Sequence, residues 1–425
     1  MTSYQLPYGH SQLTLHIDDA CAVDWIEPPF VPAADAPQEV VREALRHPVD
    51  GSSLQAYAGA HRVAIAINDK TRPVPHEHLL PPLLDQLLAI GIPEKAIQFF
   101  VATGTHVPML PEEMTRILPA EIAGRFEVIS HDCDDQANLA YLGATTRGTP
   151  IWLNRRFLEA DLKIVVGDIE PHHFAGFSGG YKTAAIGLSG RETINNNHKM
   201  LVEPGARIAE FEKNPLRQDI DEIGDAFGVQ FALNAILNGE KHIVSAVSGS
   251  PRAVMQAGVP LSRAVCQVSL PHAGGYDLVV ASVGGAPKDI NFYQSQKALT
   301  HAALLVRAQG AIILAAECPE GSGSQSYEDY MEGLLTPGDV LDKFARTGFQ
   351  VGPHKAFQVA QIASRARIYL VSSMDESLTA RLLMTPVPTL DRAFELAVSY
   401  LAPAGQSSLR IAILPRATNT IPVSA

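Results

Sequence analysis

The segment Gly167–Lys182 gathers the residue types with the widest chemical use in this sequence. Its letters, GDIEPHHFAGFSGGYK, place two histidines, four glycines and a lysine directly after the apolar run Leu162–Val166. Glycines let backbone N–H groups approach an anion closely, and the Lys182 amine can serve as a cation or as a nucleophile for covalent attachment. Loops of this length inside a compact domain are usually functional, so we expect part of an active site here.

The same segment comes close to a nucleotide-binding P-loop. The pattern GxxxxGK[ST] is met by Gly176, Lys182 and Thr183, but Tyr181 stands where the second glycine belongs. A side chain at that position obstructs the backbone cradle around the phosphates. An ATPase or kinase is therefore an alternative function, which binding of Mg-ATP would favour.

Two further polar segments also follow apolar runs. Asn68–Pro73 follows Val63–Ile67 and combines an aspartate, a hydroxyl and an arginine, whose planar fork suits a carboxylate or phosphate. Thr103–His106 follows Ile97–Ala102, and a histidine beside a glycine can reach a cleft as acid or base. Taken alone, each segment is more often an ordinary polar loop than part of a site.

Two helix-associated segments complete the set. Asn195–His198 comes after the glycine-rich segment, where it serves either as a helix cap or as a source of a histidine metal ligand. No HExxH-type spacing supports zinc. Asn291–Lys297 opens a helix farther along, and Gln294 and Lys297 are three residues apart, so they share one face. That face points either into a cleft or into solvent.

The elements that must position these residues alternate from about residue 60 onward. Near-continuous apolar runs between helical patterns predict α/β architecture with parallel sheets covered on both faces. Strands are predicted over Val63–Ile67, Ile97–Ala102, Phe126–Ile129, Leu162–Gly167, Val229–Leu233, Ile243–Val247, Leu278–Val283, Ala311–Ala315, Ile368–Val371 and Ile411–Leu414, and helices over Glu77–Ile90, Leu216–Phe227, Tyr293–Arg307 and Leu390–Tyr400.

The breaker cluster Ser269–Gly275 separates two such α/β series. We therefore expect two α/β domains with an active-site cleft between them, residues 1–268 forming the catalytic and cofactor-binding domain and residues 269–425 the second. In such sheets the chemistry lies in loops beyond the carboxyl ends of the strands. The proline-rich first fifty residues predict irregular wrapping.

Composition narrows the function. The 425 residues carry 33 basic and 45 acidic side chains, a formal charge of −12, with no basic run that would suit nucleic acid or an anionic membrane. The four scattered cysteines form neither a disulfide framework nor a thiolate metal site. The start, MTSYQLPYGH, lacks the features of a signal peptide, and no apolar run is long enough to span a bilayer. We expect a cytoplasmic protein.

Taken in order, these motifs resemble those of the nickel-dependent lactate racemase (LarA) family. Each motif is weak by itself, but the ordered set is specific, and the resemblance is strongest between residues 40 and 200. The motifs are D-x-T-R-P at Asp69–Pro73, G-T-H at Gly104–His106, P-H-x-x-x-G-F-S-G-G-x-K at Pro171–Lys182, N-H at Asn197-His198 and Y-Q-x-x-K at Tyr293–Lys297.

The resemblance implies a cofactor and roles for four residues. The cofactor is a nickel-pincer nucleotide, a Ni(II)-pyridinium-3,5-bisthiocarboxylic acid mononucleotide attached covalently at Lys182. His198 would supply the protein ligand to nickel. His106 and His172 would be the paired acid/base residues. Cofactor-assembly enzymes are then expected partners.

The resemblance also implies the residues that hold cofactor and substrate. The cofactor would contact Asp69, Lys70, Thr71, Arg72, Ser178, Gly179, Gly180, Lys182, Gln294 and Lys297, and the substrate Arg72, Tyr293, Gln294 and Lys297. The chain departs from the family pattern at Val107, where arginine is frequent, and at Ile186, where proline is usual.

The implied reaction is racemisation or epimerisation of a 2-hydroxy acid by proton-coupled hydride transfer. Moving the Cα hydrogen as hydride avoids a carbanion beside a carboxylate, while a histidine takes the hydroxyl proton. Lactate, longer aliphatic hydroxy acids, malate and sugar acids all fit. Besides the P-loop alternative, a non-catalytic protein that binds an anionic metabolite stays open, and unchanged behaviour after replacing both His106 and His172 would favour it.

Overall fold

The computed structural model describes residues 1–271, 275–402 and 409–423, and the chain forms two compact units. One unit is the continuous stretch Phe30–Val265, and the other combines Met1–Pro29 with Cys266–Ala425. Both are of α/β type, as the sequence predicts. Each unit is described by itself below. Of the predicted boundary Ser269–Gly275, residues 272–274 lie outside the described residues.

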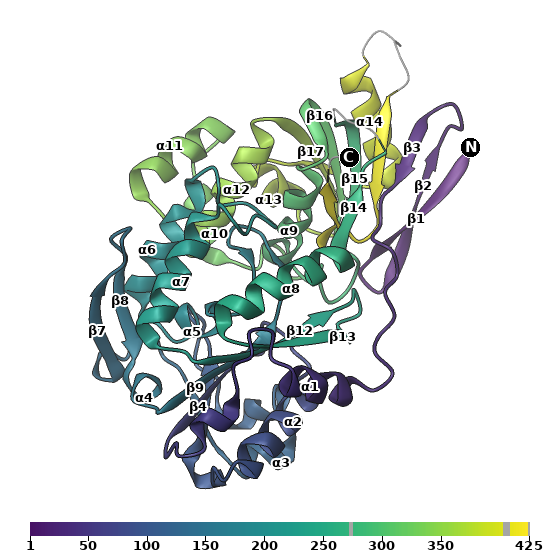
Figure 1. The fold of residues 1–425 in the computed structure, drawn as a ribbon. Coiled ribbons are helices and arrows are strands. Elements are labelled where there is room, and N and C mark those ends of the chain that lie inside the picture. Colours follow the sequence, from purple (N-terminus) through teal and green to yellow (C-terminus); the bar gives the residue numbers. More distant parts are fainter. Residues whose placement is uncertain (272–274, 403–408, 424–425) are drawn as a thin grey trace. The chain divides into compact units, whose positions relative to one another are not determined.

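The unit Phe30–Val265 contains a six-stranded sheet in the order β13-β12-β9-β4-β5-β6 (Figure 1). Neighbouring strands are parallel except β12 and β13, which are antiparallel. The strands are β4 (Val63–Asn68), β5 (Ile97–Ala102), β6 (Glu127–Ser130), β9 (Leu162–Asp168), β12 (Phe231–Leu237) and β13 (Ile243–Gly249).

Helices cover the sheet of this unit, and two small antiparallel pairs accompany it. The helices are α1 (Pro37–Arg46), α2 (His76–Ala89), α3 (Ala120–Ala123), α4 (Arg155–Leu158), α5 (Lys182–Ala185), α6 (Arg191–Lys199), α7 (Pro215–Phe227) and α8 (Pro251–Cys266); the pairs are β7 (Leu139–Ala144) with β8 (Pro150–Asn154) and β10 (Pro171–His172) with β11 (Gly176–Phe177).

Burial explains why these segments are central strands. All seven residues of β9 are buried, and five of the six in β4 are. Val63, Ile65 and Ile67 point to the face on which α1 and α2 pack. A strand buried on both faces needs apolar residues at successive positions, which is the pattern seen in the sequence.

The other unit contains a six-stranded parallel sheet in the order β18-β17-β16-β15-β19-β3. Its strands are β3 (Ala22–Trp25), β15 (Tyr276–Ser282), β16 (Val306–Ala315), β17 (Ala366–Val371), β18 (Thr385–Val387) and β19 (Arg410–Leu414), joined by the parallel pair β14 (Gln267–Ser269) and β20 (Ile421–Val423). Its helices are α9 (Phe292–Ala302), α10 (Gln325–Met331), α11 (Pro337–Thr347), α12 (Pro353–Ala363), α13 (Glu376–Arg381) and α14 (Leu390–Leu401).

The prediction of irregular structure over the first fifty residues is wrong. Residues Thr2–Tyr8 and Ser11–Ile17 form the antiparallel hairpin β1–β2, β3 adds an edge strand beside β19, and Pro37–Arg46 is helix α1. Leu6, Leu15 and Ile17 of the hairpin join the core of the unit that contains β15 and β16. The first 29 residues therefore fold with the second half of the chain, which differs from the expected division at residues 268 and 269.

Three smaller differences concern the end of one helix, a segment expected to be one loop, and the direction of one strand. The helix expected over Tyr293–Arg307 ends at Ala302, because β16 already begins at Val306. The segment Gly167–Lys182 is not one loop, since it contains the short pair β10–β11. The sheets are not wholly parallel, because β12 and β13 form a hairpin. No helix among the described residues is long and apolar enough to cross a membrane.

Candidate active site

Three loops of the unit Phe30–Val265 bring the predicted residues to one edge of its sheet. Asp69 follows β4, Thr103–His106 follows β5, and Ile169 begins the segment after β9. These three strands are parallel neighbours, so their carboxyl ends lie at the same edge. This is where parallel α/β sheets place ligands.

Asp69 holds His106 in a defined tautomer. His106 Nδ1 donates to Asp69 Oδ2 at 2.7 Å, and the other oxygen accepts from the hydroxyl and the amide of Thr71 at 2.7 and 3.1 Å. With the proton on Nδ1, Nε2 of the neutral ring carries a lone pair and can act as a base. Asp69 is 3% exposed, whereas half of the His106 side chain is exposed.

The Asp69 carboxylate stays charged in spite of its burial. Burial raises its pKa, but the hydrogen bond and charge of His106, together with the bonds from Thr71, outweigh that effect and bring the pKa below its usual value. The neighbouring Lys70 forms an ion pair with Glu113. Arg72 is exposed and donates to the Thr71 carbonyl at 3.4 Å. An imidazolium on His106 would therefore meet an anionic partner.

His172 is held in the opposite way. The backbone N–H of Ala175 donates to His172 Nδ1 at 3.1 Å, so the neutral ring carries its proton on Nε2. The β10–β11 pair fixes this geometry, because His172 lies opposite Gly176 in its register. His172 is buried and stacks on His173, with ring centroids 4.5 Å apart.

The turn Ser178–Lys182 is clasped by the protein itself. The buried guanidinium of Arg217 donates to the Gly179 carbonyl at 3.1 and 3.2 Å, and the Gly180 amide donates to Asn234 Oδ1 at 3.0 Å. Gly180 has φ +56°, and a Cβ there would lie 2.5 Å from Met255 Cγ. The Gly180 amide is thus engaged within the protein, so this glycine serves the close packing of the turn.

The amine of Lys182 is easily deprotonated. Burial lowers its pKa to about 7, and the positive charges of Arg72 and Arg217 contribute, against the opposing charges of Asp168 and Asp69. Burial likewise raises the pKa of Asp168 to about 7, with Glu170 adding to the rise. An uncharged amine is the nucleophilic form of lysine, so Lys182 has the state that covalent attachment needs.

His198 has the tautomer that a metal ligand needs. It lies on α6, and its Nδ1 donates to Asn197 Oδ1 at 3.1 Å. The other end of the Asn197 amide donates to Asp219 Oδ2 at 2.9 Å and to the Leu216 carbonyl at 3.1 Å, which fixes the orientation of the amide. Nε2 of His198 therefore carries the lone pair. Burial lowers the pKa of His198 to about 3, with the charge of Lys182 assisting, so the ring is neutral.

These residues belong to one constellation. The ring of Phe174 lies 4.7 Å from that of His172 and 5.0 Å from that of His198. Lys182 acts electrostatically on His198 and is itself affected by Asp69. The structure thus gathers His172, Lys182 and His198 near the Asp69–His106 pair.

The predicted residues of the second half lie on α9 in the other unit. Asn291 caps that helix by accepting from the Gln294 amide at 3.1 Å. Lys297 Nζ donates to Gln294 Oε1 at 2.7 Å, which confirms that the two side chains share one face. Tyr293, Gln294 and Lys297 are all partly exposed.

The geometry does not match a P-loop. Tyr181 packs against Gly224 of α7, where a Cβ would lie 2.2 Å from the Tyr181 Cγ atom. The helix after Lys182 is the single turn α5, and the Gly180 amide is used by Asn234. The backbone cradle that nucleotide phosphates require is therefore not formed at these positions.

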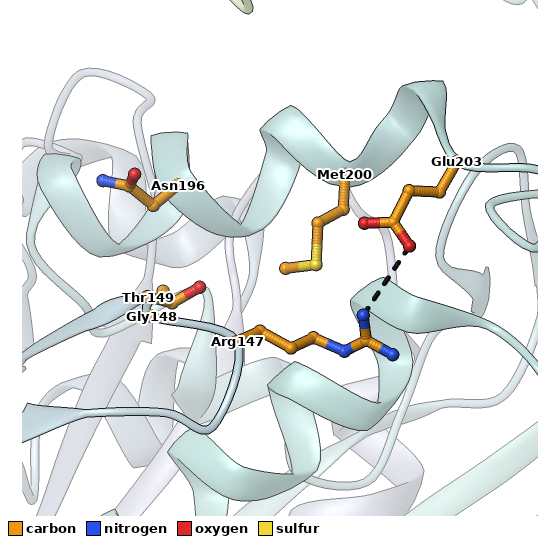
Figure 2. A pocket seen from close by; sticks show the side chains of 6 residues that line it. All are labelled: Arg147, Gly148, Thr149, Asn196, Met200 and Glu203. Atoms are coloured by element: carbon orange, nitrogen blue, oxygen red, sulfur yellow. Dashed lines mark ion pairs between the residues drawn. The ribbon is translucent and has the colours of Figure 1, made fainter.

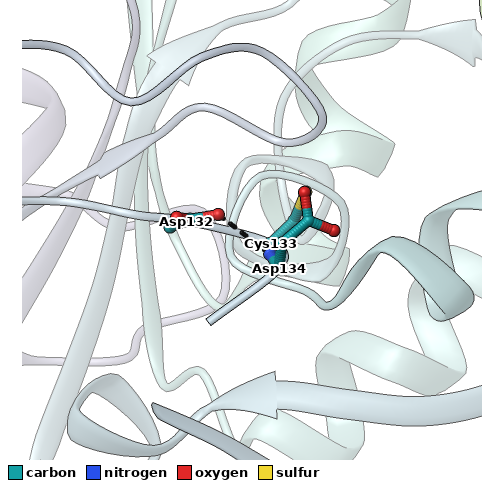
Figure 3. Close-up of side chains that lie close together, drawn as sticks. All are labelled: Asp132, Cys133 and Asp134. Atoms are coloured by element: carbon teal, nitrogen blue, oxygen red, sulfur yellow. Dashed lines mark hydrogen bonds between the residues drawn. The ribbon is translucent and has the colours of Figure 1, made fainter. Parts of the chain in front are cut away.

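A second cluster with metal-ligating residue types is Asp132, Cys133 and Asp134 (Figure 3). Arg191 already occupies both oxygens of Asp134 at 2.7 Å. Burial raises the pKa of the Cys133 thiol to about 11, so a thiolate is disfavoured. We assign no metal to this cluster.

A cavity of about 230 Å³ lies beside α6, where Asn196 of the segment Asn195–His198 is part of its lining (Figure 2). It is lined by Arg147, Gly148, Thr149, Asn196, Met200 and Glu203. The cation of this cavity, Arg147, forms a 3.6 Å ion pair with Glu203 and donates to Gln218 at 2.8 Å. Its charge is therefore engaged, and the cavity is not part of the candidate site.

Several residues that shape the site escaped sequence reasoning. Arg217 and Asn234 hold the turn, Asp219 orients Asn197, and Lys241 forms an ion pair with Glu170 beside His172. Lys241 has φ +67°, which is unusual for a residue with a side chain. The sequence carries no motif for these partners, since each comes from a distant element.

The fold is that of an α/β protein of two units, and one of these units gathers two histidines and a lysine of lowered pKa at its candidate site. Residues 8–209 match the family model for the lactate racemase N-terminal domain, and residues 272–420 match that for the lactate racemase C-terminal domain. The chain belongs to the lactate racemase family, and it is an isomerase with a lactate racemase-like function.

Known relatives agree along the whole chain. A lactate racemase from Thermoanaerobacterium thermosaccharolyticum is 28% identical over 99% of both chains, and one from Lactiplantibacillus plantarum is 29% identical over 98% of both. The solved lactate racemase apoprotein from T. thermosaccharolyticum superposes with a TM-score of 0.91, covering 99% of this chain and 100% of that one, at 28% identity. A Thermotoga maritima protein shares the fold alone, with a TM-score of 0.67 and 17% identity over 93% of this chain and 100% of that one.

Proposed function

We propose that this chain inverts the stereocentre of a 2-hydroxy acid with the help of a nickel-pincer nucleotide tethered to Lys182. The observation that carries the proposal is the pair of histidines in opposite tautomers, His106 on Asp69 and His172 on the Ala175 amide. A racemase must remove a proton on one side and return one on the other. Two histidines in complementary states suit that task.

The residues present fit the cofactor. Lys182 has a pKa near 7 and so offers an uncharged amine for attachment, and His198 is a neutral ring whose Nε2 lone pair suits nickel. When bound, this group supplies an electron-poor ring that accepts the Cα hydrogen as hydride and returns it. Delivery of the nucleotide would require cofactor-assembly enzymes as partners.

Other residues would hold the cofactor or the substrate. We assign cofactor contacts to Asp69, Lys70, Thr71, Arg72, the turn Ser178–Gly180, Gln294 and Lys297. The substrate carboxylate would pair with Arg72 or Lys297, since a cation fixes an anion in a reacting geometry, while Tyr293 and Gln294 complete its contacts. Ser178 also donates its hydroxyl to the Asp168 carbonyl, which holds the turn in shape for these contacts.

The proton chemistry follows from the two tautomers. His106 takes the substrate hydroxyl proton on Nε2, and Asp69 stabilises the imidazolium that forms. His172 would return a proton from Nε2 as an imidazolium, because a neutral ring that gave up this proton would be left as an imidazolate. The imidazolium and the Nε2 base of the reverse direction both carry a proton on Nδ1, so in either role His172 must give up the bond from Ala175.

The test replaces each histidine with glutamine. Because each direction needs both groups, His106→Gln and His172→Gln should each lower inversion in both directions by roughly a hundred- to ten-thousand-fold. The measurement is chiral chromatography of lactate and other 2-hydroxy acids, begun from each enantiomer with enzyme made alongside the assembly enzymes. His61→Gln, an exposed histidine, is the control. Near wild-type inversion in either site variant would refute the two-histidine mechanism.

A further inference from the structure

Helices α9 and α12 share a largely buried polar cluster in which only Tyr293 has been assigned a role so far. The α9–α12 polar cluster consists of Tyr293 and Gln296 from α9 and His354, Lys355 and Gln358 from α12. Lys355 is 2% exposed and Gln296 is 1% exposed. Buried ionic and amide groups destabilise a helix–helix interface unless they are well paired, so packing alone would favour apolar residues here.

The contacts of the cluster define its chemistry. Lys355 Nζ donates to Gln296 Oε1 at 3.1 Å and lies 5.0 Å from the centre of the Tyr293 ring. Because Oε1 of Gln296 faces the ammonium, its Nε2 donor points elsewhere, and within the described part of the chain it has no hydrogen-bond partner. A positive charge beside an unsatisfied N–H donor calls for an acceptor-rich, negatively charged group.

The cluster adjoins the residues assigned to the substrate. Tyr293, Gln296 and Lys297 are spaced i, i+3 and i+4 on α9, so they lie along one stripe of the helix. Lys297, which donates to Gln294 Oε1 at 2.7 Å, is assigned to one carboxylate under the proposed function. Lys355 of α12 brings a second ammonium to this stripe through its hydrogen bond to Gln296. The stripe therefore has more positive charge beside it than a monocarboxylate needs.

We propose that Lys355 and Gln296 form a subsite for a second carboxylate, so that the chain prefers 2-hydroxy dicarboxylic acids. This inference rests on the proposed function. The incoming carboxylate would pair with Lys355 and accept from Gln296 Nε2, while the partly exposed Tyr293 ring gives up its place over the ammonium. The substrate class is therefore that of malate rather than lactate.

The first experiment compares malate and lactate as substrates of the cofactor-loaded enzyme. Wild type should show the higher kcat/KM for malate. Lys355→Met should lower kcat/KM for malate by about 10- to 100-fold, the value of a hydrogen bond to a charged group, and leave that for lactate within about threefold. Lys355→Arg keeps the charge and should retain part of the preference.

A matched control exists in the same unit. Lys343 also lies over a tyrosine, 4.3 Å from the Tyr330 ring, and donates to the Tyr330 carbonyl at 2.6 Å. Lys343→Met should change neither the kcat/KM for malate nor the kcat/KM for lactate. In calorimetric titrations of protein made without cofactor, malate should bind more tightly than lactate to wild type, and Lys355→Met should remove that difference.

The outcomes separate the two proposals. An enzyme that inverts lactate but not malate overturns the dicarboxylate subsite and leaves the proposed function standing. Equal losses on both substrates in Lys355→Met would mean that Lys355 only ties α12 to α9, which also overturns the subsite. Absence of inversion for every 2-hydroxy acid tested would instead overturn the proposed function.

Discussion

Burial sets the charge states of two groups of the candidate site at the scale of single residues. It lowers the pKa of Lys182 to about 7 and that of His198 to about 3, so both nitrogen atoms have lone pairs available near neutral pH. Asp69 is also buried, yet its partners His106 and Thr71 keep its pKa below the usual value. One unit thus combines two uncharged nitrogen groups with a charged carboxylate, because the hydrogen bonds and the charge of its partners outweigh the burial of Asp69.

The reactivity of Lys182 should show this directly. An ordinary lysine has a pKa of about 10.4 and reacts slowly with acylating reagents at neutral pH. Since the pKa of Lys182 is lowered to about 7, its acetylation by acetic anhydride should reach half of its maximal rate near pH 7 and plateau above pH 8. Peptide mass spectrometry of cofactor-free protein measures this, with a lysine peptide as reference. A profile that still rises between pH 9 and 10 would contradict the lowered pKa.

Lys182 also makes a prediction about the loaded enzyme. Lys182→Ala should abolish covalent attachment of the nucleotide, since no other amine of the turn can replace it. Intact-mass spectrometry of wild type and variant, each made with the assembly enzymes, is the measurement. The same mass increment on both proteins would show that the tether lies elsewhere.

His198 should govern metal retention rather than folding. His198→Ala removes the imidazole lone pair that Asn197 orients, and nickel should leave the loaded enzyme on dialysis. Metal analysis before and after dialysis tests this, with His242→Ala, an exposed histidine, as the control. Full nickel occupancy in His198→Ala would exclude it as the ligand.

At this scale the sequence suggests the residues that we propose to touch cofactor or substrate, but not the residues that orient them. His106, His172, Lys182 and His198 stand in short strings that a reader can recognise. Asp219 and Arg217 lie on α7, and their partners come from elements that are separate in sequence. The pairing is a property of the folded chain, which is why no local pattern reveals it.

At the scale of elements, helices α7 and α8 support the turn Ser178–Lys182. Arg217 of α7 holds the Gly179 carbonyl and pairs with Asp221 at 3.3 Å, and Asp221 pairs with Arg252 of α8 at 3.2 Å. The Arg252 guanidinium lies 5.6 Å from the Tyr181 ring. The turn therefore rests on two helices joined by charges, and its shape depends on their close approach.

Gly224 of α7 packs directly against Tyr181 of this turn. Gly224→Ala should destabilise the protein by about 1–3 kcal/mol, because its Cβ would lie 2.2 Å from Tyr181 Cγ, and the clash outweighs the gain in helix propensity. Urea unfolding measures the loss, and attachment at Lys182 should weaken with it. Gly338→Ala near the start of α11, where the nearest side-chain atom is 3.6 Å away, is the matched control. Equal stability of the two variants would refute the close packing of Gly224 against Tyr181.

Elements were predictable where burial is continuous along the chain. β4, β5 and β9 emerge because both faces are covered, so apolar residues run together. The hairpin β1–β2 does not stand out in the sequence because most of its residues are not buried and Pro7 interrupts the pattern, although Leu6, Leu15 and Ile17 are buried. The predicted end of α9 lies five residues beyond the observed one because Ala303, Leu304 and Leu305 continue its apolar pattern after the helix ends at Ala302.

At the scale of the whole molecule, the residues proposed for function are divided between two units. These units do not correspond to the two halves of the sequence. The residues proposed to bind nickel, tether the cofactor and move protons all lie in Phe30–Val265, whereas Tyr293, Gln294 and Lys297 lie in the other unit. The continuous unit has its own sheet and its own buried core. The other unit needs the first 29 residues, which supply β3 and three core residues of the hairpin.

This division predicts how the separated parts behave. A fragment of residues 30–265 should fold on its own, because its sheet and core are complete, and its Lys182 should show the same low pKa in the acetylation profile as the whole chain. Cooperative urea unfolding followed by circular dichroism tests the folding. The fragment should not invert any 2-hydroxy acid, since residues proposed for the substrate, Tyr293, Gln294 and Lys297, are absent.

A fragment of residues 266–425 should be less stable alone, because Leu6, Leu15 and Ile17 no longer fill its core. The edge of β19 would also be exposed, which favours aggregation. Adding a peptide of residues 1–29 should raise its unfolding midpoint. If the 266–425 fragment unfolds at the same urea concentration with and without the peptide, the first 29 residues are an accessory rather than a part of that unit.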